Sequence, residues 1–451
     1  KQLRKPHWLQ LKIELYTYKL ISTLTRIVKS FKVDDSVTLK EKILLWSKSF
    51  KTSIYLDSNE YKNRNGDIES ILAAGVIDKI PFTTENSFKK LDDFISKVND
   101  WIFGFLSYEL KNEIEDLQSK NNTTFNIPNL FFFQPKKIWI IKSQTVEAHY
   151  VSDEDILIDW NKINSIQLPN NIVKKKKINF LPQLKRLDYI DKINRILSHI
   201  KRGDIYEVNF CMEWIAYGKE IDPESVFRKL NKISRTPMSG FFKDKNFFLI
   251  SSSPERFIKK TGKKIISQPI KGTAKRDPNK KNDLKIRNSL TNDPKERAEN
   301  IMIVDLVRND LSKFSVPGSV KVTELCKVYP FKQVNQMIST VESKLDNQKT
   351  IIDVLESTFP MGSMTGAPKV EALKIIDDLE LSQRGVYSGS IGYIQPNGNF
   401  DFNVVIRSLL YDSQKKLLSF HVGSAITSSS VPEREYDECL LKAKPMISIF
   451  D

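Results

Sequence analysis

Short strand-like runs separated by turn clusters recur over the first third of this 451-residue chain. Residues 52–56 and 101–108 are rich in aromatic and branched apolar side chains, and Asp, Ser and Asn follow the first of these runs. The apolar runs 130–133 and 138–141 predict a buried hairpin, because a polar, proline-containing stretch separates them. No regular strand–helix–strand repeat is present, so parallel sheets are not expected.

A polar stretch over residues 152–182, rich in Asn and Lys, predicts a connection between two parts of the chain. Beyond it, apolar residues at helical spacing over 189–200 predict a helix that ends at Gly203, and a strand resumes at 206–210. A chain of this length favours two subdomains or one large intertwined unit. The mixture of elements predicts an α+β fold with largely antiparallel sheets.

Composition excludes several classes of function. The formal charge is +16, but lysine far outnumbers arginine and no recognisable nucleic-acid module accompanies it, so we expect no nucleic-acid partner. An anionic substrate is compatible with this charge. No run approaches 18 apolar residues, so no membrane span is expected. The N-terminus has no signal-like apolar region and no initiator Met, so we expect that it is trimmed.

The three cysteines, Cys211, Cys326 and Cys439, lie far apart in the sequence. This spacing predicts buried thiols in a reducing compartment, which indicates a cytoplasmic protein. The four histidines are scattered, which argues against a zinc site.

A lysine and a glutamate are each fixed by turn residues. Lys271 lies in Pro-Ile-Lys-Gly-Thr, between an apolar strand end and a Gly-Thr turn, and Glu255 lies sixteen positions earlier in Ser-Pro-Glu-Arg-Phe. Such a pair can serve as nucleophile and acid. Lysine attacks only as the neutral amine, so we expect its pKa to be depressed. The alternative is that both are solvated surface groups.

Two Glu-x-x-Glu pairs lie in segments with helical patterns: Glu296 with Glu299, and Glu435 with Glu438. At a spacing of three residues both carboxylates of a pair share one helix face. Two such helices that face each other could offer oxygen ligands to Mg²⁺. The alternative is a solvated charged face, and nothing in the spacing links the two pairs.

Glycine-rich turns suggest anion sites. Residues 362–369, Gly-Ser-Met-Thr-Gly-Ala-Pro-Lys, precede a helical pattern and could expose backbone N–H groups to an anion, without the ending of a P-loop. Gly423, Ser424 and Ala425 close a strand and could bind a carboxylate. Arg407 ends an apolar strand run, where it is either a solvated charge or a bidentate carboxylate clamp.

Taken in order, these motifs resemble those of the chorismate-utilising enzymes. The matching segments are Ser-Pro-Glu at 253–255, Pro-Ile-Lys-Gly-Thr at 269–273, residues 299–310, Thr-Gly-Ala-Pro-Lys at 365–369, Tyr-Ser-Gly-Ser-Ile-Gly-Tyr at 387–393 and residues 435–442. The family includes component I of anthranilate synthase and of aminodeoxychorismate synthase, and the isochorismate and salicylate synthases.

The resemblance implies a domain organisation and a fold. Residues 1–170 resemble the N-terminal region of the anthranilate synthase component I type, and 180–451 the chorismate-binding catalytic domain, an intertwined unit of two sheets with helices packed outside. Asp57 stands where the N-terminal motif usually has Glu, which leaves open whether an amino acid such as tryptophan binds there.

According to this resemblance, the residues at three positions distinguish the branches of the family. The anthranilate enzymes carry Ala where Lys271 stands and a His where Gln336 stands, whereas the aminodeoxychorismate synthases carry Lys. The water-adding members place a lysine base at the position of Glu207, and the ammonia users usually have Gln there. The resemblance therefore implies amination of chorismate to 4-amino-4-deoxychorismate, in the route to 4-aminobenzoate and folate. Anthranilate synthase component I is the alternative within the family, and a non-catalytic regulatory relative is the alternative outside catalysis.

The resemblance also implies residue roles. Glu255 would protonate the departing C4 hydroxyl, and Lys271 would add to C2 of the ring. Mg²⁺ would be held by Glu296, Glu299, Glu435 and Glu438. The substrate-binding set would be Tyr393 and Arg407 on the enolpyruvyl carboxylate, Thr273, Lys442 and the backbone of Gly423, Ser424 and Ala425 on the ring carboxylate, and Thr365. No cysteine has the context of a glutaminase nucleophile, so a separate glutamine amidotransferase subunit would supply ammonia.

Overall fold

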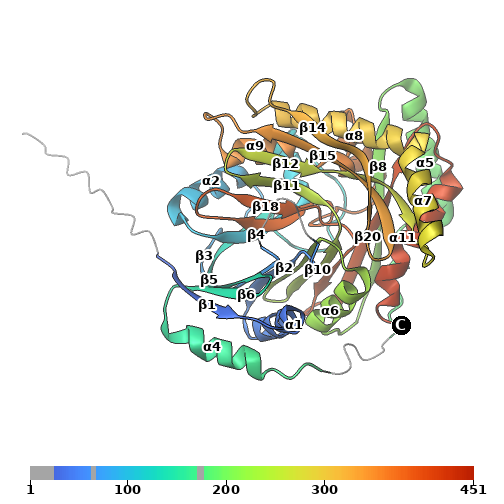
Figure 1. The fold of residues 1–451 in the computed structure, drawn as a ribbon. Coiled ribbons are helices and arrows are strands. Elements are labelled where there is room, and N and C mark those ends of the chain that lie inside the picture. The colour runs from blue at the N-terminus through green and yellow to red at the C-terminus, as the bar shows by residue number, and fades with distance from the viewer. Residues whose placement is uncertain (1–24, 62–67, 170–176) are drawn as a thin grey trace, which may run out of the picture.

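The computed structural model of the chain describes residues 25–61, 68–169 and 177–451. The N-terminal residues considered for trimming lie outside these ranges. Every ladder between the described strands is antiparallel. Helices pack on the outside of the strands (Figure 1). The predicted α+β fold with antiparallel sheets is confirmed.

Two sheets share one long strand pair, β3 (Ser70–Lys79) and β5 (Leu130–Lys142). Residues 130–133 of β5 pair with a strand of one sheet, and residues 137–142 pair with a strand of the other. The described strands therefore form one continuous network of 20 strands with two arms. The predicted hairpin over 130–141 is wrong, because Pro135 lies within β5, opposite a bulge of β3 where a missing N–H is tolerated.

The first sheet runs in this order: β1 (Ile27–Lys32), β6 (Thr145–Tyr150), β5, β3, β2 (Thr52–Asp57), β9 (Met238–Asp244), β10 (Phe247–Ser253), β19 (Ser408–Asp412), β20 (Leu417–Ile426) and β8 (Glu207–Ala216), with β7 (Leu181–Pro182) and β16 (Gly366–Ala367) also on β8. The second sheet continues from β5 in this order: β4 (Ile102–Leu106), β17 (Ser390–Ile394), β18 (Phe400–Asn403), β11 (Arg256–Thr261), β12 (Lys264–Gln268), β15 (Val334–Lys344) and β14 (Lys321–Pro330), with β13 (Ile270–Lys275) also on β15. Both sheets therefore contain strands from before and from after residue 170, which meet at the β2–β9 ladder in the first sheet and at the β4–β17 ladder in the second.

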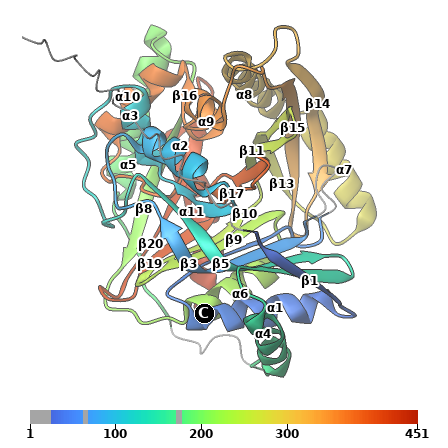
Figure 2. The same cartoon turned by 90° about the vertical axis from the view of Figure 1, so that its left-hand side faces the viewer.

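The described helices are α1 (Ser36–Trp46), α2 (Ser87–Val98), α3 (Lys111–Ile114), α4 (Glu154–Ser165), α5 (Arg186–Arg202), α6 (Pro223–Ser234), α7 (Lys280–Asn292), α8 (Pro294–Ser312), α9 (Ile351–Thr358), α10 (Lys369–Leu379) and α11 (Pro432–Ser448). Short 3₁₀ turns are η1 (Ser47–Ser49), η2 (Tyr108–Leu110) and η3 (Gly362–Met364). In Figures 1 and 2, α7 and α8 lie against β13, β14 and β15, and α11 lies against β20. No described helix is both long and apolar enough to cross a membrane.

Local signals in the sequence match several of these elements. The predicted helix over 189–200 is α5, and Gly203 ends it in the left-handed conformation, with φ +86°. The polar stretch 152–182 contains more structure than predicted: α4 lies within it and buries Ile156 and Ile163. Residues 170–176 of that stretch lie outside the described residues.

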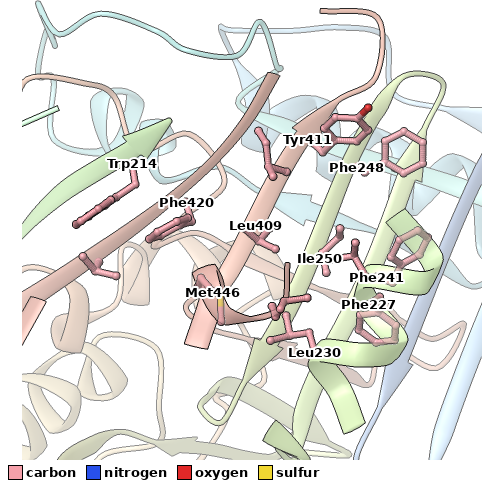
Figure 3. Close-up of a cluster of buried hydrophobic side chains, with 14 of the residues drawn as sticks. Trp214, Phe227, Leu230, Phe241, Phe248, Ile250, Leu409, Tyr411, Phe420 and Met446 are labelled. Atoms are coloured by element: carbon pink, nitrogen blue, oxygen red, sulfur yellow. The ribbon is translucent and has the colours of Figure 1, made fainter. Parts of the chain in front are cut away.

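Both faces of the first sheet are buried. Adjacent residues Phe241 and Phe242 on β9 are fully buried in different cores, as the alternation of side chains along a strand requires. Figure 3 shows the outer core, where side chains of β8, β9, β10, β19 and β20 meet Phe227 and Leu230 of α6 and Met446 of α11. Burying each such side chain stabilises the fold by roughly 1.5–3 kcal/mol, which fixes the strands that carry the site.

Candidate active site

Lys271 lies on β13 beside a β-bulge. The ladder with β15 shifts register between Ile270 and Thr273, and Gly272 within the bulge has φ +94°. A Cβ on Gly272 would lie 3.0 Å from Glu296 Oε2 and 3.1 Å from Met337 Cβ. Glycine is required here for the backbone conformation and for space, and bulges of this kind redirect neighbouring side chains.

Asn300 fastens this bulge to α8. Its buried side-chain Nδ2 donates to the carbonyl oxygen of Lys271 at 3.3 Å and of Met337 at 3.4 Å, and its Oδ1 accepts from the Ser339 hydroxyl. The same helix carries Glu296, so α8 positions both the lysine backbone and an acidic pair. Asn300 is absent from the residues predicted from the sequence, although it directly follows Glu299 in a matching segment.

Lys271 makes a buried ion pair with Glu207. Its Nζ lies 2.5 Å from Glu207 Oε1, and the two side chains are 10% and 1% exposed. Burial acts to lower the pKa of Lys271, but the carboxylate of Glu207, with smaller contributions from Glu299 and Glu255, raises the pKa above its ordinary value. The expected depressed pKa is therefore wrong for the free protein, which holds this amine as an ammonium group.

Glu255 lies in the short turn between β10 and β11 and is 4% exposed. Burial raises the pKa of Glu255 to about 7, although the Ser363 hydroxyl, which donates to Oε1 at 2.7 Å, and the charge of Lys271 oppose this rise. A carboxyl group with a pKa near neutrality can hold a proton and donate it at neutral pH. This is the setting required of a general acid.

The two predicted Glu-x-x-Glu pairs lie on α8 and α11. Burial raises the pKa of Glu299 to about 7, and burial together with the charges of Asp293 and Glu438 raises the pKa of Glu296. The charge of Glu438 on α11 therefore acts on Glu296 on α8. This electrostatic link between the two pairs could not be read from their spacing in the sequence. Oε1 of Glu299 is buried without a hydrogen-bond partner among the described residues. Among the described residues, no three side chains of Asp, Glu, His or Cys lie together as a ready-formed metal site.

Lys442 connects α11 to β20. Its Nζ donates to the carbonyl oxygen of Gly423 at 2.8 Å and lies 2.7 Å from Glu438 Oε1. Burial acts to raise the pKa of Glu438, but the charge and hydrogen bond of Lys442 lower it below its usual value. Residues 423–425 of β20 pair with β8, while β19 pairs only with residues 417–419. The other edge of residues 423–425 therefore has no described strand partner and can receive a carboxylate.

Arg407 has the properties of an anion clamp. It follows β18 with φ +51°, and burial lowers the pKa of its guanidinium. No hydrogen bond or ion pair joins this guanidinium to another described side chain, although its backbone oxygen accepts from the Ser252 N–H at 3.2 Å. A desolvated cation without an anionic partner favours a bound carboxylate.

Two predicted substrate-binding threonines differ in setting. Thr365 is fully buried, and its hydroxyl donates to the carbonyl oxygens of Met361 at 3.2 Å and Gly362 at 3.3 Å. This hydroxyl braces the turn that carries Ser363, instead of facing a substrate, because the local carbonyls satisfy it. Thr273 is exposed on β13, opposite Gln336 in the ladder, and stays a candidate.

Tyr393 lies apart from this group. Its ring packs on Trp101 and Phe103, with centroids 5.6 and 5.9 Å apart, and lines a separate cavity of about 680 Å³ between the two sheets. Asp57 lines the same cavity. The structure therefore does not bring Tyr393 to Arg407, because strand alternation turns its side chain towards this inner cavity.

Tyr387, which the sequence did not single out, lies nearer to the carboxylate-binding segments. Its hydroxyl accepts a weak hydrogen bond from Cys211 Sγ at 3.9 Å, and Cys211 is the ladder partner of Gly423. The next residue, Ser388, donates its N–H to the carbonyl oxygen of Val405 at 2.9 Å, two positions before Arg407. Both tyrosines belong to one matching segment, so only packing separates their roles.

The two-armed antiparallel sheet thus brings Lys271 within electrostatic reach of the buried carboxyl group of Glu255. The chain belongs to the family of chorismate binding enzymes, whose model matches residues 43–448.

Several relatives and solved structures show the extent of the similarity. The chain is 33% identical over 346 residues to aminodeoxychorismate synthase component 1 of Klebsiella aerogenes, which covers 76% of each protein. It is 30% identical over 356 residues to anthranilate synthase component 1 of Thermus thermophilus, covering 77% of this chain and 76% of the relative. The crystal structure of anthranilate synthase component I from Streptococcus pneumoniae superposes with a TM-score of 0.73 at 24% identity, covering 86% of this chain and 94% of that chain. This last likeness concerns the fold.

Proposed function

We propose that this protein converts chorismate and ammonia into 4-amino-4-deoxychorismate, as component I of an aminodeoxychorismate synthase. The observation that carries this proposal is that Lys271 and Glu255 share one buried site, with the pKa of Glu255 raised to about 7. Several relatives that match most of the chain bear the name of this enzyme. The product supplies the route to 4-aminobenzoate and folate.

The chemistry divides one hard displacement into two easier ones. The neutral amine of Lys271 forms a bond to C2 of the ring, the ring double bond shifts, and the C4–O bond breaks. Glu255 gives its proton to the departing oxygen, which leaves as water, because hydroxide is a poor leaving group. Ammonia then forms a bond to C4, the double bond shifts back, and the C2–N bond to Lys271 breaks. A proton of the new ammonium group at C4 restores the protonated form of Glu255.

The substrate carries two carboxylates, and the site offers separate places for them. Arg407 would bind the enolpyruvyl carboxylate, supported by its partly buried guanidinium, which has no anionic partner among the described residues. The open edge of residues 423–425, with Lys442 beside it, would receive the ring carboxylate. Both assignments rest on charge complementarity.

The residues present fit a bound Mg²⁺. Magnesium prefers carboxylate oxygens and keeps several waters, and Glu299 Oε1, which is buried and accepts no hydrogen bond among the described residues, belongs to such a donor set. Glu296, Glu299, Glu435 and Glu438 would hold the ion directly or through water. When bound, it would neutralise the charge that accumulates between the acidic pairs and the ring carboxylate.

A separate glutamine amidotransferase would supply the ammonia. Burial raises the pKa of Cys211 to about 12, of Cys439 to about 11, and that of Cys326 above its ordinary value. These are all the cysteines of the chain. A thiol attacks as the thiolate, so none of them is suited to hydrolyse glutamine.

The alternative is anthranilate synthesis, which the similarity to anthranilate synthase component 1 favours. Lys271 and Gln336 oppose it, because the resemblance places Ala and His at these positions. Gln336 is buried on β15, with its Oε1 unpartnered among the described residues. The deciding experiment incubates the purified chain with chorismate, Mg²⁺ and concentrated ammonium, and identifies the product by mass spectrometry and anthranilate fluorescence. We expect aminodeoxychorismate; a dominant anthranilate signal would refute the proposal.

A further inference from the structure

Lys271 can attack carbon only after it has lost a proton, yet the free site holds it as an ammonium group. The acidic groups whose charges act on Lys271 come from four elements: Glu207 on β8, Glu255 before β11, Glu296 and Glu299 on α8, and Glu438 on α11. Among the described residues, Glu207 is the one that contacts Nζ directly. A proton acceptor must lie within hydrogen-bond reach of the proton that it takes.

Glu207 is held rigidly in a dry environment. It is the first residue of β8, and its backbone pairs with Ala367 of β16. A Cβ on Gly366 would lie 2.2 Å from the Glu207 carbonyl oxygen, so the two strands are in close contact. The side chain is 1% exposed, and its Oε2 is buried without a hydrogen-bond partner among the described residues. Glu207 Oε1 is therefore held against Lys271 Nζ where water has little access.

We propose that Glu207 is a catalytic residue that takes a proton from Lys271 before the amine attacks the substrate. The proposal rests on the function proposed above. One N–H bond of the ammonium group breaks and one O–H bond forms on Glu207 Oε1, so a buried ion pair becomes a neutral pair without a change in net charge. When the bond between Lys271 and C2 of the aminated product breaks, Glu207 returns the proton to the amine of Lys271. No other reactant is required.

A static role for Glu207 leads to the opposite result. If the carboxylate only braces Lys271, it opposes attack, because it stabilises the protonated amine. Replacing Glu207 by the neutral, isosteric Gln would then leave more of Lys271 as the free amine and speed its reaction. If Glu207 accepts the proton, the same substitution slows the reaction, because no other described carboxylate contacts Nζ to remove that proton.

The test measures covalent capture of substrate by Lys271 without ammonia. Wild type, Glu207→Gln, Glu207→Asp and Glu213→Gln are mixed with chorismate and Mg²⁺, and intact mass and peptide mapping follow the adduct on Lys271 over time and pH. Glu213 is the matched control, because it lies buried on the same strand and bonds Ser419 and Thr124 outside the site. Turnover with ammonium is measured in parallel.

We expect Glu207→Gln to form the adduct about 100-fold more slowly than wild type near pH 7, with the rate recovering as pH rises. Glu207→Asp should keep the wild-type pH profile at a reduced rate, which also answers the question if the Gln variant is unstable, and Glu213→Gln should match wild type. Adduct formation by Glu207→Gln at the wild-type rate or faster would overturn the proposal. So would a wild-type protein that makes aminodeoxychorismate without an adduct. A wild-type protein that makes no aminodeoxychorismate at all would instead overturn the proposed function on which it rests.

Discussion

The hydroxyl of Ser363 offers a way to tune the general acid without removing it. Ser363 donates to Glu255 Oε1 at 2.7 Å, and both side chains are buried. This bond favours the charged carboxylate, so Ser363→Ala should raise the pKa of Glu255 above its present value of about 7. A hydrogen bond to a charged group is worth about 1.5–3 kcal/mol and a neutral one about 0.5–1.5 kcal/mol, and the difference of about 1–1.5 kcal/mol corresponds to about one pH unit.

The sign of the effect follows from the role of the acid. Glu255 must be protonated to act, so activity is lost as pH rises through its pKa, and a higher pKa moves this alkaline limb upward. At pH 8 the protonated fraction should increase from about one tenth to about one half, roughly five-fold. The assay is kcat/KM for chorismate from about pH 6 to pH 9 at a constant concentration of free ammonia.

A matched control exists in the same small cavity beside Glu255, which Ser267 also lines. The Ser267 hydroxyl donates to the carbonyl oxygen of Phe257 at 2.8 Å and does not bond Glu255. Ser267→Ala should therefore leave the alkaline limb where it is. If Ser363→Ala leaves the limb unmoved or shifts it downward, Glu255 is not the acid that limits activity at high pH.

Other changes test the remaining roles. Lys271→Ala and Glu255→Ala should each cost about two to four decades in turnover with ammonium; near wild-type turnover of Lys271→Ala would show that the lysine acts only through charge or packing. Glu299→Gln and Glu438→Gln should raise the Mg²⁺ concentration for half-maximal activity about ten-fold or more. Glu433→Gln, on the same α11 but outside the two acidic pairs, should not. Unchanged Mg²⁺ titrations in both pair variants would show that these pairs only form a solvated charged face. The isolated chain should use ammonium but not glutamine until an amidotransferase subunit is added, and glutamine turnover by the chain alone would contradict the assignment of the ammonia source.

Parts of the fold were predictable because their signals are local. The periodicity of residues 189–200 and the following Gly203 define α5 and its end. The Gly-Thr turn predicted after Lys271 is instead a bulge within β13, at which Gly272 has a positive φ. The hairpin predicted over 130–141 failed for the opposite reason. Its two apolar halves belong to one strand that pairs with different partners in two sheets. An apolar pattern indicates that residues are buried, but it does not indicate which strand they pair with.

The sequence by itself determined which side chains this protein has available for chemistry: a lysine and a glutamate that each lie next to turn-forming residues, and two acidic pairs at helical spacing. Only the tertiary structure decided which of them meet. It pairs Lys271 with Glu207, 64 residues away in the sequence, and places the acidic pairs of α8 and α11 within electrostatic reach of each other. It also packs Tyr393 against Trp101 and places Tyr387 beside Cys211. The reason is physical: spacing along the chain sets the face of a helix or strand, but a pKa and a contact depend on neighbours that folding brings from elsewhere. The raised pKa of Lys271, where its chemistry requires a free amine, is set by such a neighbour.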